Sequence, residues 1–371
     1  MTGFAINYQQ ARDQFRRAAH ERGAALDSYT HPECVGPDGA PLRTDVAWLG
    51  PRDAAGVLVC VSGTHGVEGR CGSACQVEIL SNPPNADPPP ATAALFVHAL
   101  NPYGMAHDRR VNEDNIDINR NWIDHTNPPD NPDYELVHQA LVPQNWTGPT
   151  REAADKVLTQ IAAERGIEFV QTAVTHGQWS HKDGLFYGGR EYTWSTRLLR
   201  KICTEYLTES RHVGYIDLHT GLGGYRQAEP IFRGGWDDGA LTRARGWYGP
   251  VTQSEQSTSS STPIVGNTAT LMADALGDSQ LLTAITLEFG TLPGPAVLNA
   301  LRADNWLRLQ TNPDAELTKE ITTQIRQAFC PTDRMWRATA LAKGRSAYYQ
   351  ALHGLGQSLQ ETDTEQLHHP R

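Results

Sequence analysis

Long apolar runs are missing from this chain. No window of the sequence holds eighteen consecutive apolar residues, which is the length that a membrane-spanning helix requires. The first eight residues, Met1 to Tyr8, contain neither a basic segment nor an apolar core of signal-peptide length. We therefore expect a cytoplasmic protein that has no membrane partner.

Basic charge is also scarce. The chain has 32 Lys and Arg residues against 42 Asp and Glu residues, which gives a formal net charge of −10. Proteins that bind nucleic acid present a basic face to the phosphates, so nucleic acid is not an expected partner. Two catalytic or binding loops are absent as well. There is no GxSxG turn of a serine hydrolase, and Gly221 to Gly224 do not complete the GxGxxG pattern of a dinucleotide site.

Cysteine is rare and is not arranged for metal binding. The six cysteines show no CxxC or zinc-finger spacing, so buried free thiols are expected. At 371 residues with 39% apolar residues, the chain is long enough to bury a large core. We expect one catalytic domain over residues 1–371, with a peripheral N-terminal segment at 1–50 and a polar tail at 357–371.

Apolar segments of strand length alternate with segments of helix length. The predicted strands are 57–61, 93–100, 213–218 and 282–289, and the predicted helices are 8–24, 70–80, 151–165 and 194–207. This alternation predicts an α/β sandwich whose active residues lie at strand ends. Two segments interrupt the pattern. The proline-rich stretch 82–90 is a predicted loop, and the Ser/Thr tract 253–262 is either a lid or a surface excursion.

Two of the apolar segments lead into possible metal ligands. His65 and Glu68 lie three residues apart directly after the segment 57–61, among glycines that allow unusual backbone dihedrals. His219 follows the segment 213–218 in the same way and offers a third ligand. Zinc accepts imidazole nitrogen and carboxylate oxygen, and three protein ligands leave one position open, as in catalytic sites. The alternative for His65 and Glu68 alone is a capped turn with a solvated histidine.

A further stretch, 109–122 (RRVNEDNIDINRNW), is dense in cations and amides. With the HxxE pair, the NP turn at 101–102, the histidine of DLHTGLG (217–223) and the glutamate of LEFGT (287–291), it resembles the zinc metallocarboxypeptidase superfamily over roughly residues 55–295. These strings and DGLFYGG (183–189) are similar to a bacterial branch near the succinylglutamate desuccinylase and aspartoacylase group. The resemblance implies a mixed, largely parallel twisted sheet between helices, with loop insertions.

The same resemblance implies roles for individual residues. His65, Glu68 and His219 would bind one Zn²⁺ per chain, and Glu288 would act as general base on the metal-bound water. The apolar flanks of Glu288 argue against an ordinary surface glutamate, because a carboxylate between them is partly buried. Arg110 corresponds to the arginine that stabilises the oxyanion, with Arg109 as the second choice.

The stretch 115–122 also supplies substrate and supporting groups. Asn119 and Arg120 match the pair that binds a substrate carboxylate, and Asp117 matches the residue that orients the first ligand histidine. Asp217 is either a similar supporting group or a turn former at a strand end. Tyr187 is either a substrate contact or part of a structural turn. The family's mobile-loop tyrosine has no clear counterpart, because neither Tyr225 nor Tyr248 sits in a matching motif.

These features lead to one function with open alternatives. We expect a zinc-dependent hydrolase that cleaves a peptide or amide bond next to a free carboxylate, on a small-molecule or short-peptide substrate. The alternative within this class is an N-acyl amino acid deacylase, and the sequence does not choose between them. A zinc-dependent binding protein without catalysis is a third reading, which predicts damage at Glu288, Arg110 or Arg120. None of these three residues is missing.

Overall fold

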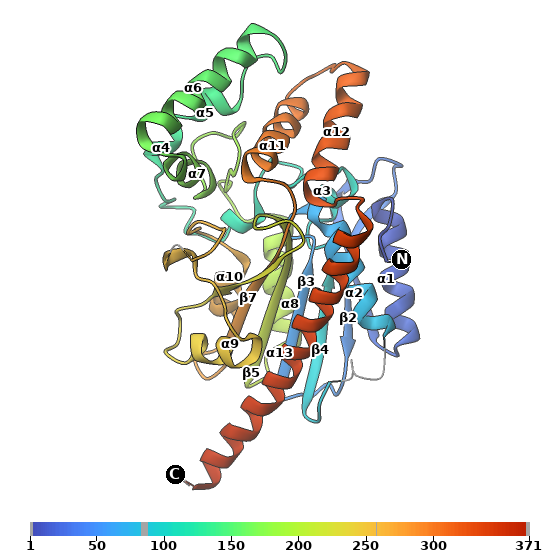
Figure 1. The fold of residues 1–371 in the computed structure, drawn as a ribbon. Coiled ribbons are helices and arrows are strands. Elements are labelled where there is room, and N and C mark those ends of the chain that lie inside the picture. Colours follow the sequence, from blue (N-terminus) through green and yellow to red (C-terminus); the bar gives the residue numbers. More distant parts are fainter. Residues whose placement is uncertain (1–2, 83–87, 257, 369–371) are drawn as a thin grey trace.

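A single sheet of seven strands runs through the computed structural model of the chain, which describes residues 3–82, 88–256 and 258–368, with side chains up to residue 361 (Figure 1). The strand order is β1-β2-β4-β3-β5-β7-β6. The bounds of the strands are β1 Ala25–Val35, β2 Pro41–Leu49, β3 Gly56–Ser62, β4 Thr92–His98, β5 His212–Gly221, β6 Ala228–Arg233 and β7 Leu281–Gly290.

The sheet is parallel in its centre and antiparallel at both edges. Strands β4, β3, β5 and β7 pair in parallel, whereas β2 pairs antiparallel with β4, β1 with β2, and β6 with β7. Every residue of β3, β4 and β5 is buried, as expected for parallel strands that are covered on both faces. The predicted fold class, a mixed and largely parallel sheet between helices, is confirmed.

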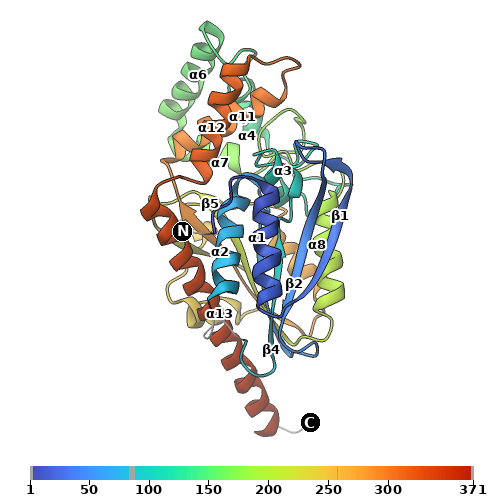
Figure 2. The same cartoon turned by 90° about the vertical axis from the view of Figure 1, so that its right-hand side faces the viewer.

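Helices cover both faces of the sheet, and a further group lies beyond one end of it. Figure 2 shows α1, α2 and α13 on one face and α8 on the other. The bounds of the longer helices are α1 Tyr8–Glu21, α2 Gly69–Ser81, α6 Pro149–Arg165, α7 Ile167–Thr175, α8 Trp194–Tyr206, α9 Ala240–Tyr248, α10 Thr268–Ala275, α11 Gly294–Arg308, α12 Ala315–Phe329 and α13 Arg334–His368. The short ones are α3 Pro102–Ala106, α4 Pro132–Glu135 and α5 His138–Leu141, with 3-10 turns η1 Gly66–Glu68, η2 Ile118–Arg120 and η3 Ser254–Gln256.

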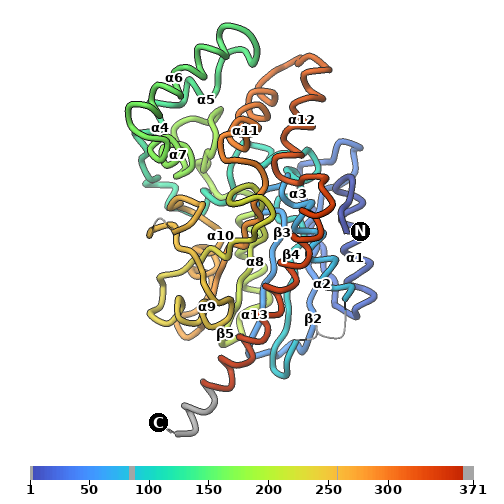
Figure 3. Tube along the Cα trace, viewed as in Figure 1, coloured from blue at the N-terminus to red at the C-terminus, as the bar shows by residue number. Residues whose placement is uncertain are grey.

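The two faces of the sheet carry separate apolar cores. Phe15 of α1 and Trp336 of α13 belong to one core, and Leu199 of α8 and Met272 of α10 belong to the other. A third core joins α7, α11 and α12 around Val67 of η1. In Figure 3 the green segment α4–α7 and the orange pair α11 and α12 lie together at one end of the molecule, although they are far apart in the sequence. This third core therefore fixes the loop that contains the first two predicted ligands.

The segment expected to be peripheral contributes two strands. Residues 25–35 form the edge strand β1, and residues 41–49 form β2, which lies within the sheet between β1 and β4. At the other end of the chain, α13 extends to residue 368 and includes much of the predicted polar tail, whereas residues 369–371 lie outside the described residues. The predicted loop 82–90 overlaps residues 83–87, which also lie outside them.

All six cysteines are free thiols, and five of them are buried. This agrees with the expectation from their spacing. No helix in the described part of the chain has both the length and the apolar character needed to cross a bilayer.

Candidate metal centre and catalytic cavity

The candidate site lies where the carboxyl ends of β3, β5 and β7 meet. His65 and Glu68 are positioned by the turn η1 that follows β3, and His219 lies near the end of β5. In the β5–β7 ladder, His219 is paired in register with Glu288. Paired residues of neighbouring strands point to the same face of the sheet, so the third ligand and the predicted base share one face.

Gly66 allows the turn η1 to pack closely against α3. A Cβ atom at position 66 would lie 1.9 Å from the carbonyl carbon of Gly104, a distance that no side chain can occupy. The backbone N–H of Gly66 donates to the carbonyl of Arg110 over 3.1 Å, and that of Val67 donates to the carbonyl of Arg109 over 2.8 Å. The glycine between the two predicted ligands is therefore required for docking the turn on the segment that carries the arginines.

The three predicted ligands converge. The Nδ1 atom of His219 lies 3.0 Å from Nδ1 of His65 and 3.0 Å from Oε2 of Glu68, and Nδ1 of His65 lies 2.9 Å from Oε1 of Glu68. One donor atom from each residue falls within 4.8 Å of the others, and all three side chains are buried. This is the spacing of ligands around a single ion.

Each histidine contacts an aspartate through Nε2, the ring nitrogen that faces away from the other two predicted ligands. Nε2 of His65 donates to Oδ1 of Asp117 over 3.1 Å, and Nε2 of His219 lies 2.8 Å from Oδ2 of Asp217. A carboxylate can only accept, so a ring proton on Nε2 satisfies each of these contacts, and a cation at the centre would then meet the two Nδ1 lone pairs. Two imidazole nitrogens and a carboxylate fit a zinc site with an open position. Asp217, which the sequence left open, thus contacts His219 as Asp117 contacts His65.

The protonation of each residue in this group depends on the charges of its neighbours. Burial alone would raise the pKa of Glu68, but the neighbouring His65 and His219 hold it below its ordinary value. Burial would lower the pKa of His219, but Asp217 and Glu68 raise it well above the ordinary value for histidine. The carboxylates around the two rings thus favour positive charge at this point, which a metal cation would also supply.

Two other groups of possible donors occur among the described residues. They are His31, Cys34 and Glu113, and His138, His181 and Asp183. In the first group both ring nitrogens of His31 are already used, since Nδ1 accepts the backbone N–H of Cys34 over 3.1 Å and Nε2 lies 3.2 Å from Glu113. The second group includes the exposed Asp183. The buried group of His65, Glu68 and His219 is the one whose nitrogens are oriented for a metal.

Glu288 lies beside this group on β7. Its Oε1 atom accepts the backbone N–H of Leu222 over 2.9 Å, and the residue is 7% exposed and lines the cavity described below. Burial, followed by the nearby negative charge of Glu68, raises the pKa of Glu288 to about 7. A carboxylate with such a pKa can accept and release a proton near neutral pH, as a general base requires.

The two neighbouring arginines separate in space. Arg110 donates through Nη1 to Glu68 over 2.9 Å and through Nε to Asp117 over 3.0 Å, and it lines the cavity. Arg109 is not among the lining residues and instead forms a buried ion pair with Asp304 over 3.3 Å. Arg110 is therefore the arginine at the candidate site, whereas Arg109 joins the segment to α11.

Asn119 and Arg120 both line the cavity. Asn119 Nδ2 lies 3.4 Å from His219 Nε2. The guanidinium of Arg120 donates to the carbonyl of Asn119 over 2.9 Å and to that of Thr175, and a Cβ at Gly177 would lie 2.6 Å from its Cδ atom. The backbone thus holds this buried guanidinium in a fixed position, which suits binding of a carboxylate.

Tyr187 does not line the cavity, but Phe186 does. The guanidinium carbons of Arg110 and Arg120 lie 5.0 and 5.4 Å from the centre of the Phe186 ring, so this ring contacts both cations. Phe186 has a φ of 54°, a strained value for a residue with a large side chain. In this loop, therefore, the side chain that reaches the cavity is that of Phe186, next to the predicted Tyr187. Tyr225 is half exposed and Tyr248 is buried in an apolar core, and neither lines the cavity.

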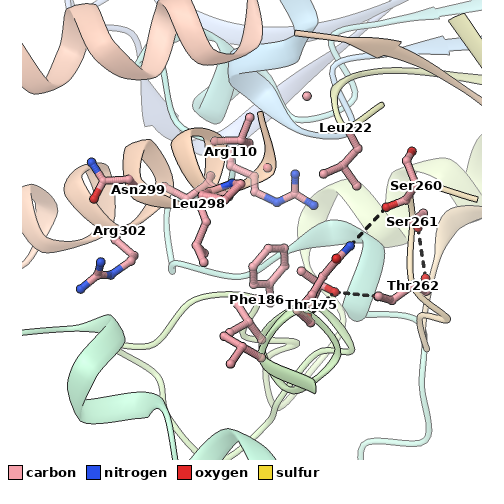
Figure 4. A pocket seen from close by; sticks show the side chains of 18 of the residues that line it. Arg110, Thr175, Phe186, Leu222, Ser260, Ser261, Thr262, Leu298, Asn299 and Arg302 are labelled. Atoms are coloured by element: carbon pink, nitrogen blue, oxygen red, sulfur yellow. Dashed lines mark hydrogen bonds between the residues drawn. The ribbon is translucent and has the colours of Figure 1, made fainter. Parts of the chain in front are cut away.

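The cavity has a volume of about 780 Å³ and extends from the candidate metal ligands to α6, α7 and α11 (Figure 4). Ser260, Ser261 and Thr262 of the Ser/Thr tract form part of its wall. This part of the tract is held in place, because Gln171 donates to the carbonyl of Ser260 over 3.3 Å and the hydroxyls of Thr175 and Thr262 lie 2.6 Å apart. Residue 257 of the tract lies outside the described residues.

The fold and the site together define an α/β protein with a buried His-Glu-His group at the ends of its central strands. The family model described as "Protein of unknown function (DUF2817)" matches residues 4–343, and the chain belongs to this family. A search of curated proteins gives no match.

The chain is also similar to solved structures of metallopeptidases. A carboxypeptidase A from Helicoverpa armigera shares 13% identity over 92% of this chain and 73% of that one, with a TM-score of 0.42. The murein-tripeptide amidase MpaA from Escherichia coli O157 shares 17% identity over 80% and 97%, with a TM-score of 0.33. A metallo-carboxypeptidase from Burkholderia cenocepacia shares 11% identity over 94% and 69%, with a TM-score of 0.45. Identities and TM-scores this low transfer no substrate or activity to this chain.

Proposed function

We propose that this protein is a zinc-dependent hydrolase that cleaves a peptide or amide bond next to a free carboxylate. The observation that carries the proposal is the convergence of His65, Glu68 and His219 beside Glu288 and Arg110 at one cavity. One zinc ion per chain, held by the first three residues, would polarise the scissile carbonyl and lower the pKa of a bound water.

Glu288 is the base in this proposal. Its raised pKa and its place beside His219 allow it to take a proton from the attacking water and then deliver that proton to the leaving nitrogen. Arg110 contacts Glu68 and lines the same cavity, where its guanidinium can donate to the oxygen that becomes negatively charged. The ion pairs of Arg110 with Glu68 and Asp117 hold it there before substrate binds.

Arg120 and Asn119 select the substrate end in this proposal. A planar guanidinium with fixed geometry binds a carboxylate through two parallel hydrogen bonds. Arg120 is buried, positioned by backbone carbonyls and next to the candidate ligands. A substrate with a free carboxylate beside its scissile bond would therefore lie with that bond near Glu288.

Removal of an acyl group from an N-acyl amino acid is the second candidate activity. It is favoured by the apolar end of the cavity, whose wall includes Leu158, Val170, Val174, Phe186 and Leu298. Such a wall suits an acyl chain as well as the apolar side chains of a peptide. The two activities use the same metal, base and carboxylate contact, and they differ in the group on the far side of the scissile bond.

The proposal is tested by metal content and hydrolysis measured on the same preparation. Elemental analysis should find one zinc per chain, and hydrolysis of a panel of short peptides and N-acyl amino acids should stop on chelation and return with added zinc. The preferred member of the panel chooses between the two activities. Absence of zinc from metal-replete protein would refute the proposal, and zinc without any hydrolysis would leave a binding role for the site.

A further inference from the structure

One part of the cavity is lined by α6, α7 and α11. One face of α7 lines it along the whole helix, since the lining positions recur at helical spacing, at residues 167, 170, 171, 174 and 175. Figure 4 shows Leu298 and Arg302 of α11 on one side of Arg110, and Leu222 on the other. The backbone N–H of Leu222 donates to Glu288 over 2.9 Å. The cavity therefore continues past Arg110 toward α11.

Apolar side chains dominate this part, which is the apolar end of the cavity. They include Leu158 of α6, Val170 and Val174 of α7, Leu298 and Leu301 of α11, and Phe186. Ile167, the first residue of α7, also lines the cavity and is 64% exposed. Such a wall favours a ligand that transfers alkyl groups out of water.

The polar groups on the same helices bond to the protein itself. Arg151 and Arg302 each donate to Asp155 over 2.9 Å. The hydroxyl of Thr159 donates to the carbonyl of Asp155 over 2.8 Å, and Gln171 donates to a carbonyl of the Ser/Thr tract over 3.3 Å. The helix backbones use their N–H and C=O groups in their own ladders. A peptide in the apolar end would therefore bury polar groups with few partners, which is costly, whereas an alkyl chain would lose no hydrogen bond.

The length of the apolar end follows from α7. Thr175 ends this helix, and its carbonyl accepts from Nε of Arg120 over 3.2 Å. Ile167 begins the helix eight residues earlier, so the wall extends about 12 Å from the contact with Arg120. An extended covalent chain advances about 1.2 Å per bond, so this distance corresponds to about ten bonds.

We propose that the apolar end binds the alkyl chain of an N-acyl amino acid whose acyl group has about eight to twelve carbons. The carboxylate of the amino acid binds Arg120, the amide lies beside Glu288, and the acyl chain runs along α7 toward Ile167. Water supplies a hydroxyl to the carbonyl carbon and a proton to the nitrogen, so the C–N bond breaks into a fatty acid and a free amino acid. The inference rests on the proposed function and makes it more specific, because it names a medium-chain acyl group in place of a peptide or a short acyl group.

The same wall could instead hold the side chain of the released amino acid. The two roles predict different preferences. If the apolar end holds the acyl chain, each methylene added to that chain increases kcat/KM by about two- to fourfold until the end is filled. If it holds the side chain, a larger amino acid increases kcat/KM and a longer acyl chain does not.

The test measures kcat/KM of the zinc-loaded full chain for glycine that carries an acetyl, hexanoyl, decanoyl or hexadecanoyl group. Glycine is the fixed residue because it has no side chain to enter the apolar end. N-acetyl-phenylalanine and the peptide Ala-Ala-Ala-Gly complete the panel. We expect kcat/KM to rise up to decanoyl-glycine and then to level off. A flat series, or a higher kcat/KM for N-acetyl-phenylalanine or the peptide than for decanoyl-glycine, would overturn the inference.

Two adjacent residues of α6 provide matched variants. Leu158 is partly buried and lines the cavity, whereas Val157 is 44% exposed and is not among the lining residues. Leu158→Trp should fill the apolar end and lower the ratio of kcat/KM for decanoyl-glycine over acetyl-glycine by about tenfold or more. Leu158→Asp, which places a charge against the chain, should lower the same ratio, and Val157→Trp should keep it. A ratio that is unchanged in both Leu158 variants, or equally reduced in Val157→Trp, would contradict the proposed position of the chain.

A binding experiment keeps the inference testable if the protein hydrolyses nothing. Calorimetry of the metal-free protein should show that decanoyl-glycine binds more tightly than acetyl-glycine, and that Leu158→Trp reduces this difference while Val157→Trp does not. This result without hydrolysis of any panel member would refute the proposed activity and retain the acyl-binding role. Hydrolysis that gains nothing from a longer acyl chain would retain the activity and overturn the inference, as would equal binding of the two glycine derivatives.

Discussion

His65 and His219 face each other through their Nδ1 atoms, which lie 3.0 Å apart. Two lone pairs at this distance would repel each other, so the two nitrogens must share a proton or a cation. In the absence of metal a proton fills this role, and Asp217 and Glu68 favour it by raising the pKa of His219 despite the opposing effect of burial. A divalent cation would displace this proton, since ligand histidines bind metal in their neutral form.

The carboxylates behind the two histidines should control metal affinity. We expect Asp117→Asn and Asp217→Asn each to weaken zinc binding by about 10- to 100-fold. A neutral amide oxygen accepts a weaker hydrogen bond from Nε2–H than a carboxylate does, and the amide can instead turn its NH₂ group toward the ring. Competition with a chromophoric chelator measures the affinity.

Asp304→Asn is the matched control for these two variants. Asp304 is a buried carboxylate that pairs with Arg109 and lies outside the cavity. This variant should lose thermal stability and keep the wild-type zinc affinity. If Asp117→Asn and Asp217→Asn bind zinc as tightly as Asp304→Asn does, the two aspartates do not orient the ligands.

Glu288→Gln should separate metal binding from turnover. The amide keeps the shape of the side chain but cannot accept a proton, so kcat should fall by about 10²- to 10⁴-fold, the contribution expected of a general base. Zinc content should stay at one per chain, because Glu288 is not among the three converging ligands. Wild-type activity in this variant would refute the assignment of the base.

The raised pKa of Glu288 also predicts how the stability of the metal-free protein depends on pH. Burial, and then the charge of Glu68, raise this pKa to about 7, above the value of an unfolded chain. The folded state therefore binds the proton more tightly, and stability is lost as pH rises from the unfolded pKa through about 7. Metal-free Glu288→Gln should thus be more stable than the metal-free wild type at pH 8, by about 1 to 3 kcal/mol, and similar at pH 4. Thermal unfolding at both pH values, with chelator present, tests this, and an equal difference at both would contradict it.

The centre of the fold is readable from the sequence, and its edges are not. The parallel strands β3, β4, β5 and β7 each contain an apolar run because both faces of the sheet are covered, and their bounds differ from the predicted ones by three residues at most. Strands β1, β2 and β6 are not among the predicted ones. The edge strand β1 is largely exposed, β2 carries Arg43 and Asp45 within its length, and β6 contains Pro230, so none of them presents a long apolar run.

The candidate site shows a similar division. His65, Glu68, His219 and Glu288 lie at the ends of apolar strands, and this position marked them in the sequence. Phe186 and Arg233 also line the cavity, but tertiary contacts alone bring them there. No sequence pattern marks the positive φ of Phe186 or the strand register that sets Arg233 beside Thr286. The only local signal is that Arg233 follows a short apolar segment.

The neighbouring arginines allow a direct test of the oxyanion contact. Arg110→Met should lower kcat by about 10²- to 10³-fold, the effect of losing one donor to a developing oxyanion. Arg109→Met should leave kcat close to that of the wild type and lower the unfolding temperature, because the buried Asp304 would keep only its longer ion pair with Arg308. Since Arg110 also contacts Glu68, zinc content must be measured in both variants, and the rates compared per bound zinc.

Equal losses of kcat in the two variants at full zinc content would show that Arg110 has no special role in the reaction. A loss confined to Arg110→Met would tie the rate to the guanidinium that reaches the cavity, since the two arginines are adjacent in the chain and differ in where their side chains end.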